Sequence, residues 1–60
     1  MTYFEYYLTL KSPEDIKTIA NADIMYARVV NPHRIPIIQQ SAEEALKEKF
    51  GIVKEMKGGE

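Results

Sequence analysis

The sequence has 60 residues, of which 45% are hydrophobic and 28% are charged, and its formal net charge is −1. The hydrophobic content argues against intrinsic disorder, and a charge this close to zero lacks the basic surplus of nucleic-acid-binding proteins. The chain has no cysteine and one histidine, which excludes disulfide bonds and zinc sites built from these residues. We therefore expect a folded protein with no metal, no cofactor and no nucleic acid as its main partner.

The length is that of one small domain, which we place at residues 1–57, with residues 58–60 as a frayed tail. A chain this short buries only about 60% of the surface that its unfolded form exposes. Without disulfides or metal, association with another chain is the remaining support for its core, and we expect a homo-oligomer. No apolar run approaches the roughly 20 residues that span a bilayer, and the N-terminus lacks the basic start of a signal peptide. We expect a cytoplasmic protein that does not associate with membranes.

The first element expected in the chain is a β-strand over "YFEYYLTLK", residues 3–11, because apolar and polar side chains alternate there. The side chains expected to face the core are those of Phe4, Tyr6, Leu8 and Leu10. The opposite face carries two large aromatic residues, Tyr3 and Tyr7. An isolated subunit would leave these two rings partly in water, so we expect another polypeptide to cover them.

A helix is expected to begin at Ser12, because an N-cap serine is followed by Pro13 and by two acidic residues in the first turn. Residues 24–30, "IMYARVV", fit two structures. Read as a strand, they are rich in β-formers and nearly all apolar, as in a central strand. Read as a helix, they continue one long helix over residues 13–30 that stops at Asn31 and Pro32. We favour the strand, because Asp23 would lie inside the apolar arc of the long helix.

The stretch "NPHRIP", residues 31–36, is expected to be a stiff turn that presents His33 and Arg34. Asn31 and Pro32 form turns, and Pro36 favours extended geometry at Ile35. A short strand is expected at residues 36–39. A second helix follows over "SAEEALKEKF", with Ser41 and Glu44 as a capping box and Gly51 as its C-terminal stop. A last short strand is expected over "IVKEM", residues 52–56.

The resulting order is β-α-β-β-α-β, that of a small two-layer α+β sandwich with a compressed ferredoxin-like arrangement. The long-helix alternative over residues 13–30 gives β-α-β-α instead. Pro36 fits the first fold badly, because the third strand of that fold is internal and proline cannot donate to a sheet ladder.

No residue pattern predicts an enzyme. His33 would have to act as a base beside a serine, but Ser12 and Ser41 are better explained as helix caps. The acidic pairs at the helix starts complement the helix dipole and, being adjacent, point about 100° apart. A small enzyme whose site forms between subunits, with His33 or a tyrosine as acid–base group, is the least favoured function.

We expect a non-enzymatic protein-interaction or regulatory module that self-associates and binds a partner protein. Tyrosine and arginine are the residues that interfaces favour. The expected partner-binding residues are Tyr3, Tyr7, Tyr26, Arg28, His33 and Arg34. The alternative function is binding of single-stranded nucleic acid or an anionic ligand through Tyr7, Arg28, His33 and Arg34, with base stacking on the tyrosine.

Overall fold

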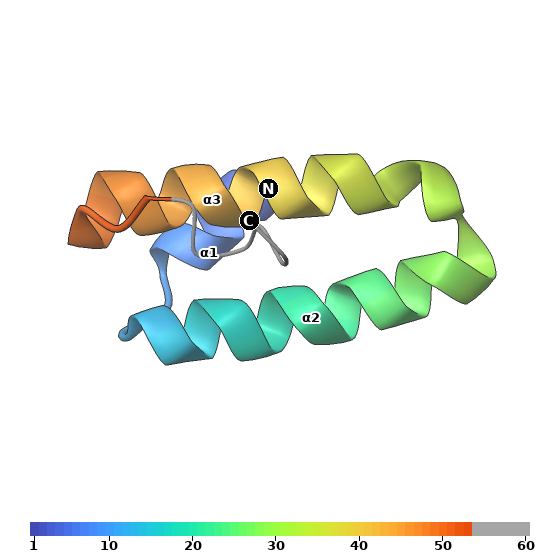
Figure 1. The fold of residues 1–60 in the computed structure, drawn as a ribbon, viewed down its shortest axis with the longest axis horizontal. Helices are drawn as coiled ribbons and strands as arrows, with labels where there is room; N and C mark the ends of the chain where they lie inside the picture. Colours follow the sequence, from blue (N-terminus) through green and yellow to red (C-terminus); the bar gives the residue numbers. More distant parts are fainter. Residues whose placement is uncertain (54–60) are drawn as a thin grey trace.

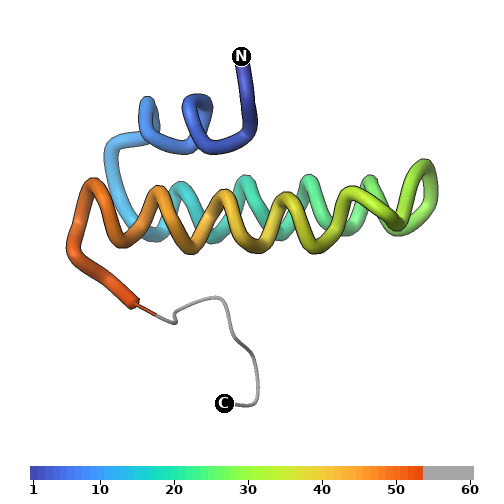
Figure 2. The backbone as a smooth tube through the Cα atoms, turned by 90° about the horizontal axis from the view of Figure 1, so that it is seen from above, coloured from blue at the N-terminus to red at the C-terminus, as the bar shows by residue number. Residues whose placement is uncertain are grey.

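The computed structural model describes residues 1–53, and within this range every regular element is helical. The elements are α1 (Tyr3–Leu8), α2 (Pro13–Val30), the short 3-10 helix η1 (Pro32–Arg34) and α3 (Ile35–Phe50). Helices α2 and α3 form an antiparallel hairpin that turns at η1, and α1 lies along one side of this hairpin (Figures 1 and 2). The molecule is therefore a helical hairpin with one short helix packed along one side of it.

The expected α+β sandwich is wrong, because residues 1–53 contain no strand. The segments expected as strands over residues 3–11, 24–30 and 36–39 lie mainly in α1, in α2 and in α3, respectively. Of the last expected strand, Ile52 and Val53 are irregular and residues 54–56 lie outside the described residues, as does the expected tail. The single helix over residues 13–30, considered as the alternative, is present as α2, although the β-α-β-α order attached to it is also wrong.

Helix α1 begins with a capping box that links Thr2 and Glu5. The Thr2 hydroxyl accepts from the Glu5 amide at 3.1 Å, and the Glu5 carboxylate accepts from the Thr2 amide at 3.2 Å. At the other end, the Lys49 ammonium donates to the carbonyl oxygens of Leu8 and Leu10 at 2.6 and 2.5 Å. Six residues are too few for an independent helix, so these caps and packing on the hairpin stabilise α1.

Helix α2 begins as the sequence predicts. The Ser12 hydroxyl accepts from the Asp15 amide at 3.1 Å, and Pro13 occupies the first turn. The helix ends at Asn31, whose own side chain accepts from the His33 amide at 3.2 Å and so starts η1. These local hydrogen bonds fold residues 31–34 into the short turn that joins α2 to α3.

Helix α3 begins six residues earlier than expected. Ile35 is helical, with φ −57° and ψ −49°, so its expected extended geometry is wrong. Pro36 lies in the first turn of α3, where a missing N–H costs nothing. Ser41 is therefore inside the helix and does not cap it. The predicted stop at Gly51 is confirmed, with a left-handed φ of 71° that glycine adopts without strain.

The core lies between the facing sides of the hairpin and under α1. Its buried side chains are those of Tyr7, Ile16, Ala20, Ile24, Ala27, Ile38, Ala42, Ala45 and Leu46. Four of these are alanines, which allow α2 and α3 to approach closely. Among residues 1–53, no helix is at once long enough and apolar enough to serve as a bilayer span.

Candidate functional site: the outer face of α2 and the turn

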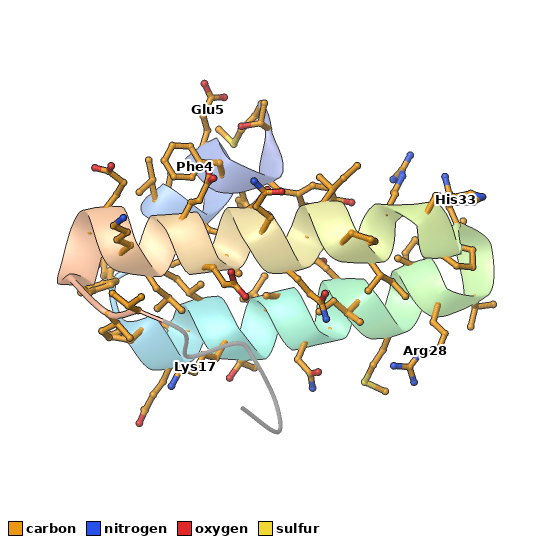
Figure 3. The ribbon with its side chains drawn as sticks, turned by 45° about the horizontal axis from the view of Figure 1, so that its top comes forward. Phe4, Glu5, Lys17, Arg28 and His33 are labelled. Atoms are coloured by element: carbon orange, nitrogen blue, oxygen red, sulfur yellow. The ribbon has the colours of Figure 1, made fainter. Side chains whose placement is uncertain are left out.

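The structure divides the six predicted binding residues between two regions. Tyr3 and Tyr7 belong to α1, whereas Tyr26 and Arg28 lie near the end of α2 and His33 and Arg34 form the turn. Figure 3 shows Arg28 directed away from the hairpin and His33 at its turn. The four residues near the turn are exposed, Tyr3 is half-buried, and Tyr7 is 0% exposed. The six residues therefore do not form one continuous surface.

Tyr7 cannot bind a partner, because the chain itself covers it. Its hydroxyl donates to Oδ2 of Asp23 at 2.6 Å, which ties α1 to α2. Its ring lies next to those of Tyr3 and Tyr6, with centroid distances of 6.1 and 5.7 Å. Burial and this hydrogen bond raise the pKa of the Tyr7 hydroxyl above its ordinary value near 10. The expectation that a second polypeptide must cover Tyr7 is therefore wrong, and Tyr3 is already half-covered.

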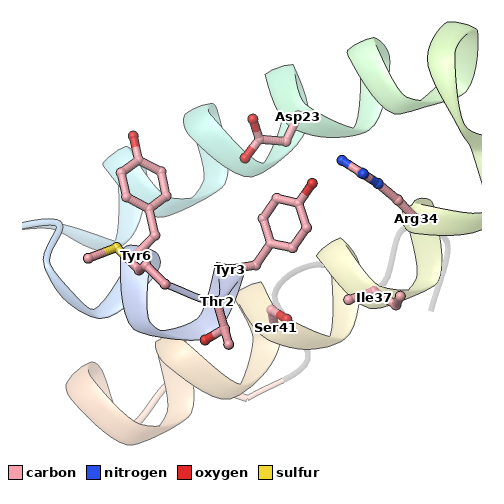
Figure 4. A pocket seen from close by; sticks show the side chains of 8 residues that line it. Thr2, Tyr3, Tyr6, Asp23, Arg34, Ile37 and Ser41 are labelled. Carbon is pink, nitrogen blue, oxygen red and sulfur yellow. The ribbon is translucent and has the colours of Figure 1, made fainter.

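An open pocket of about 680 Å³ lies where α1 meets the hairpin. Its lining residues are Met1, Thr2, Tyr3, Tyr6, Asp23, Arg34, Ile37 and Ser41. In Figure 4 the Tyr3 hydroxyl points toward the space between Asp23 and Arg34, which carry opposite charges. The pocket brings Tyr3 and Arg34 together, and these are the only two of the predicted binding residues that line it.

Helix α2 buries one row of apolar side chains in the core, and it carries another row on the side that does not face α3. Ala22, Met25, Tyr26 and Val29 follow the i, i+3, i+4, i+7 spacing of one helix face, and all four are exposed. We name these four residues the outer stripe. Met25 is 59% exposed, Tyr26 67% and Val29 84%. The described part of the chain thus leaves a row of large apolar side chains without cover.

The binding residues predicted from the sequence include Tyr26 of the outer stripe but not Met25 or Val29. In a central strand both would have been buried in the core, so only the helix reveals them as surface residues. The signal was present in the helical spacing from Ala22 to Val29, which becomes informative once residues 13–30 are read as one helix.

The turn end of the hairpin is basic. The sequence from residue 24 to residue 42 contains no aspartate or glutamate but includes Arg28, His33 and Arg34. All three are exposed, as are two apolar residues of the same stretch, Val30 at 58% and Ile37 at 55% exposure. The acidic pair Glu14 and Asp15 lies at the opposite end of α2. Helix α2 therefore has an acidic start and a basic end.

The structure places Ser12, one of the two serines considered as a partner of His33, far from that histidine. Ser12 and His33 lie at opposite ends of α2, whose 18 residues span about 27 Å. Within residues 1–53, no group of three histidine, cysteine, aspartate or glutamate side chains is placed to hold a metal ion. Besides the pocket, the two surface features of the described residues are the outer stripe and the basic turn.

Comparison with protein-family models, with curated proteins and with solved structures finds no match to this chain.

Proposed function

We propose that this protein is a small non-enzymatic protein-interaction module that self-associates through the outer stripe of α2. The observation that carries the proposal is the exposure of Met25, Tyr26 and Val29 on one side of a single helix. Large contiguous apolar patches are rare on the surface of monomeric soluble proteins, and they commonly mark interaction sites. The proposal rests on the outer stripe and not on Tyr3 and Tyr7, which the chain itself covers in part or in full.

The size of the stripe supports a weak dimer. Fully burying one side chain of the valine or methionine type contributes about 1.5–3 kcal/mol. Two chains that associate lose rotational and translational freedom, which costs at least about 4 kcal/mol. The burial of three large side chains from each copy must offset this cost before any net affinity remains. We therefore expect dissociation constants in the micromolar range, and a partner protein with a matching apolar helix would compete for the same face.

Sedimentation velocity over a range of protein concentrations tests the proposal. The wild-type chain is expected to shift from monomer to dimer as the concentration rises through the micromolar range. Val29→Glu is expected to remain monomeric, because dimerisation would bury the new carboxylate without a partner. Gln39→Glu is the matched control, since it adds the same charge at an exposed position of α3.

Both variants alter exposed side chains, so helix content measured by circular dichroism should stay unchanged. A wild-type chain that remains monomeric at high micromolar concentration would overturn the proposed function. Dimerisation of Val29→Glu with wild-type affinity would show that the outer stripe is not the interface.

A second candidate function, binding of an anionic ligand or single-stranded nucleic acid, is supported by the acid-free stretch from residue 24 to residue 42. Arg28, His33 and Arg34 would supply it, without Tyr7, whose ring is buried. Titration with a fluorescent oligonucleotide at low and high salt tests this candidate, because phosphate contacts weaken steeply with salt. Arg28→Gln should then lower the affinity, whereas the absence of binding at low salt would dismiss the candidate.

We also propose that the module acts in the cytoplasm. Extracellular domains of this size usually depend on disulfide bonds, and this chain contains no cysteine. Fractionation of host cells that express the tagged chain tests the location, and recovery in the culture medium would contradict it.

A further inference from the structure

We propose that two copies of the chain pair with their α2 helices antiparallel, about a two-fold axis that passes between the two helices, perpendicular to both, level with the midpoint between Met25 and Tyr26. This inference rests on the proposed self-association and adds the occupant's orientation and register. Two independent observations carry it, namely the symmetry of the outer stripe and the distribution of charge along α2.

The spacing of the outer stripe is symmetric about its own centre. Ala22 and Val29 lie equally far from the midpoint between Met25 and Tyr26, so the positions of the stripe, although not its residue types, are symmetric about that midpoint. A two-fold interface brings the same surface of each copy together, so the surface must be self-complementary. Antiparallel pairing about this midpoint places Ala22 opposite Val29 of the second copy, and Val29 opposite Ala22. A small side chain thus faces a larger one at both positions.

The two central residues complete the same arrangement. Met25 and Tyr26 lie on either side of the line of contact, 100° apart on the helix. The two-fold axis brings Met25 next to Met25 of the second copy on one side, and Tyr26 next to Tyr26 of the second copy on the other. All four residues of the outer stripe are covered in this register.

The charges of α2 favour the antiparallel over the parallel orientation. Parallel pairing about the same face would set two basic turns side by side, each with Arg28 and His33. Antiparallel pairing separates the turns. Asp15 lies seven residues before Ala22, on the same side of α2 and about 10 Å further along the axis. Asp15 then lies past the end of the second copy's α2, so the acidic first turn of each α2 is directed toward the basic turn of the other copy.

Disulfide cross-linking tests the orientation, and the chain is suited to it because it contains no cysteine of its own. Ala22→Cys and Val29→Cys variants are oxidised under mild conditions, each alone and as an equal mixture. In the antiparallel pair, two copies of residue 22 are about 10 Å apart along the axis, beyond the roughly 7 Å that a disulfide can bridge. We expect the mixture to yield the covalent dimer and each variant alone to yield none.

Gln39→Cys, on the exposed surface of α3, is the control for random collision and should give no covalent dimer above background. Covalent dimers from Ala22→Cys alone and Val29→Cys alone would indicate parallel pairing and overturn the inference. The absence of covalent dimer in the mixture would overturn it as well. Sedimentation of the uncross-linked chain separates the two proposals, since a strict monomer refutes self-association, whereas a dimer with the parallel pattern refutes only the orientation.

Discussion

Replacing Tyr7 with phenylalanine removes the one hydroxyl that ties α1 to α2 while it keeps the buried ring. In the native chain this hydroxyl donates to Oδ2 of Asp23 at 2.6 Å, and the tyrosine is fully buried. We expect Tyr7→Phe to lower the free energy of unfolding, because Asp23 loses its donor and only partly regains it from water.

A hydrogen bond to a charged group contributes about 1.5–3 kcal/mol to stability. Asp23 is only half-buried, so water can replace part of the lost bond, and we expect the lower end, about 1.5 kcal/mol. For a domain of this size, that loss lowers the melting temperature by about 6–12 °C. Small single cores rarely supply more than about 3–5 kcal/mol in total, so the loss is a large fraction of the stability.

A double-mutant cycle with Asp23→Ala isolates the bond from other effects of either change. Asp23→Ala leaves the buried hydroxyl without an acceptor, so adding Tyr7→Phe in that background should cost almost nothing. Urea unfolding followed by circular dichroism, at concentrations low enough to keep the chain monomeric, measures all four stabilities. A coupling energy below roughly 0.5 kcal/mol, the scatter expected for independent sites, would refute this account of how α1 is held.

The remaining predictions concern titration and helix ends. An unfolded tyrosine ionises near pH 10, whereas the raised pKa of Tyr7 keeps its hydroxyl protonated in the fold above that pH. The free energy of unfolding should therefore keep the full contribution of Tyr7 below pH 10 and decrease above it. This alkaline loss approaches about 1.4 kcal/mol per pH unit and should shrink in Tyr7→Phe, as urea unfolding at several pH values would reveal. Ser12→Ala should cost about 1 kcal/mol through loss of the cap, while Ser41→Ala, inside α3, should cost nothing. Equal losses in these two serine variants would contradict the assigned start of α3. Gly51→Ala should lower stability by about 1–2 kcal/mol because alanine resists φ near 71°, and an unchanged melting temperature would argue against the left-handed cap.

The start of α2 and the end of α3 were predictable because their signals are local. The Ser12 hydroxyl bonds an amide three residues away, and Gly51 is needed for its own backbone angle. The start of α1 has an equally local signal in the capping-box spacing of Thr2 and Glu5, but the strand predicted from the alternation of residues 3–11 takes no account of it. Over so few residues, alternation cannot distinguish a strand from a helix that is buried on one side.

The start of α3 was missed because two patterns competed. Ser41 and Glu44 have the spacing of a capping box, whereas Pro36 is compatible with a first helical turn. Packing of Ile38 and Ala42 into the core favours the earlier start, and this gain exists only once α2 lies opposite.

The sequence by itself determined the cap at Ser12 and the stop at Gly51, because each depends only on neighbouring residues. The tertiary structure alone decided the state of residues 24–30 and, with it, the candidate interface. Asp23 seemed incompatible with a long helix because its partner, Tyr7, lies 16 residues away in the chain. Once that bond forms, the carboxylate is satisfied on the inner side of α2, and the same helix turns Met25 and Val29 outward. Local spacing cannot encode this choice, because the energy that decides it comes from contacts between segments far apart in the sequence.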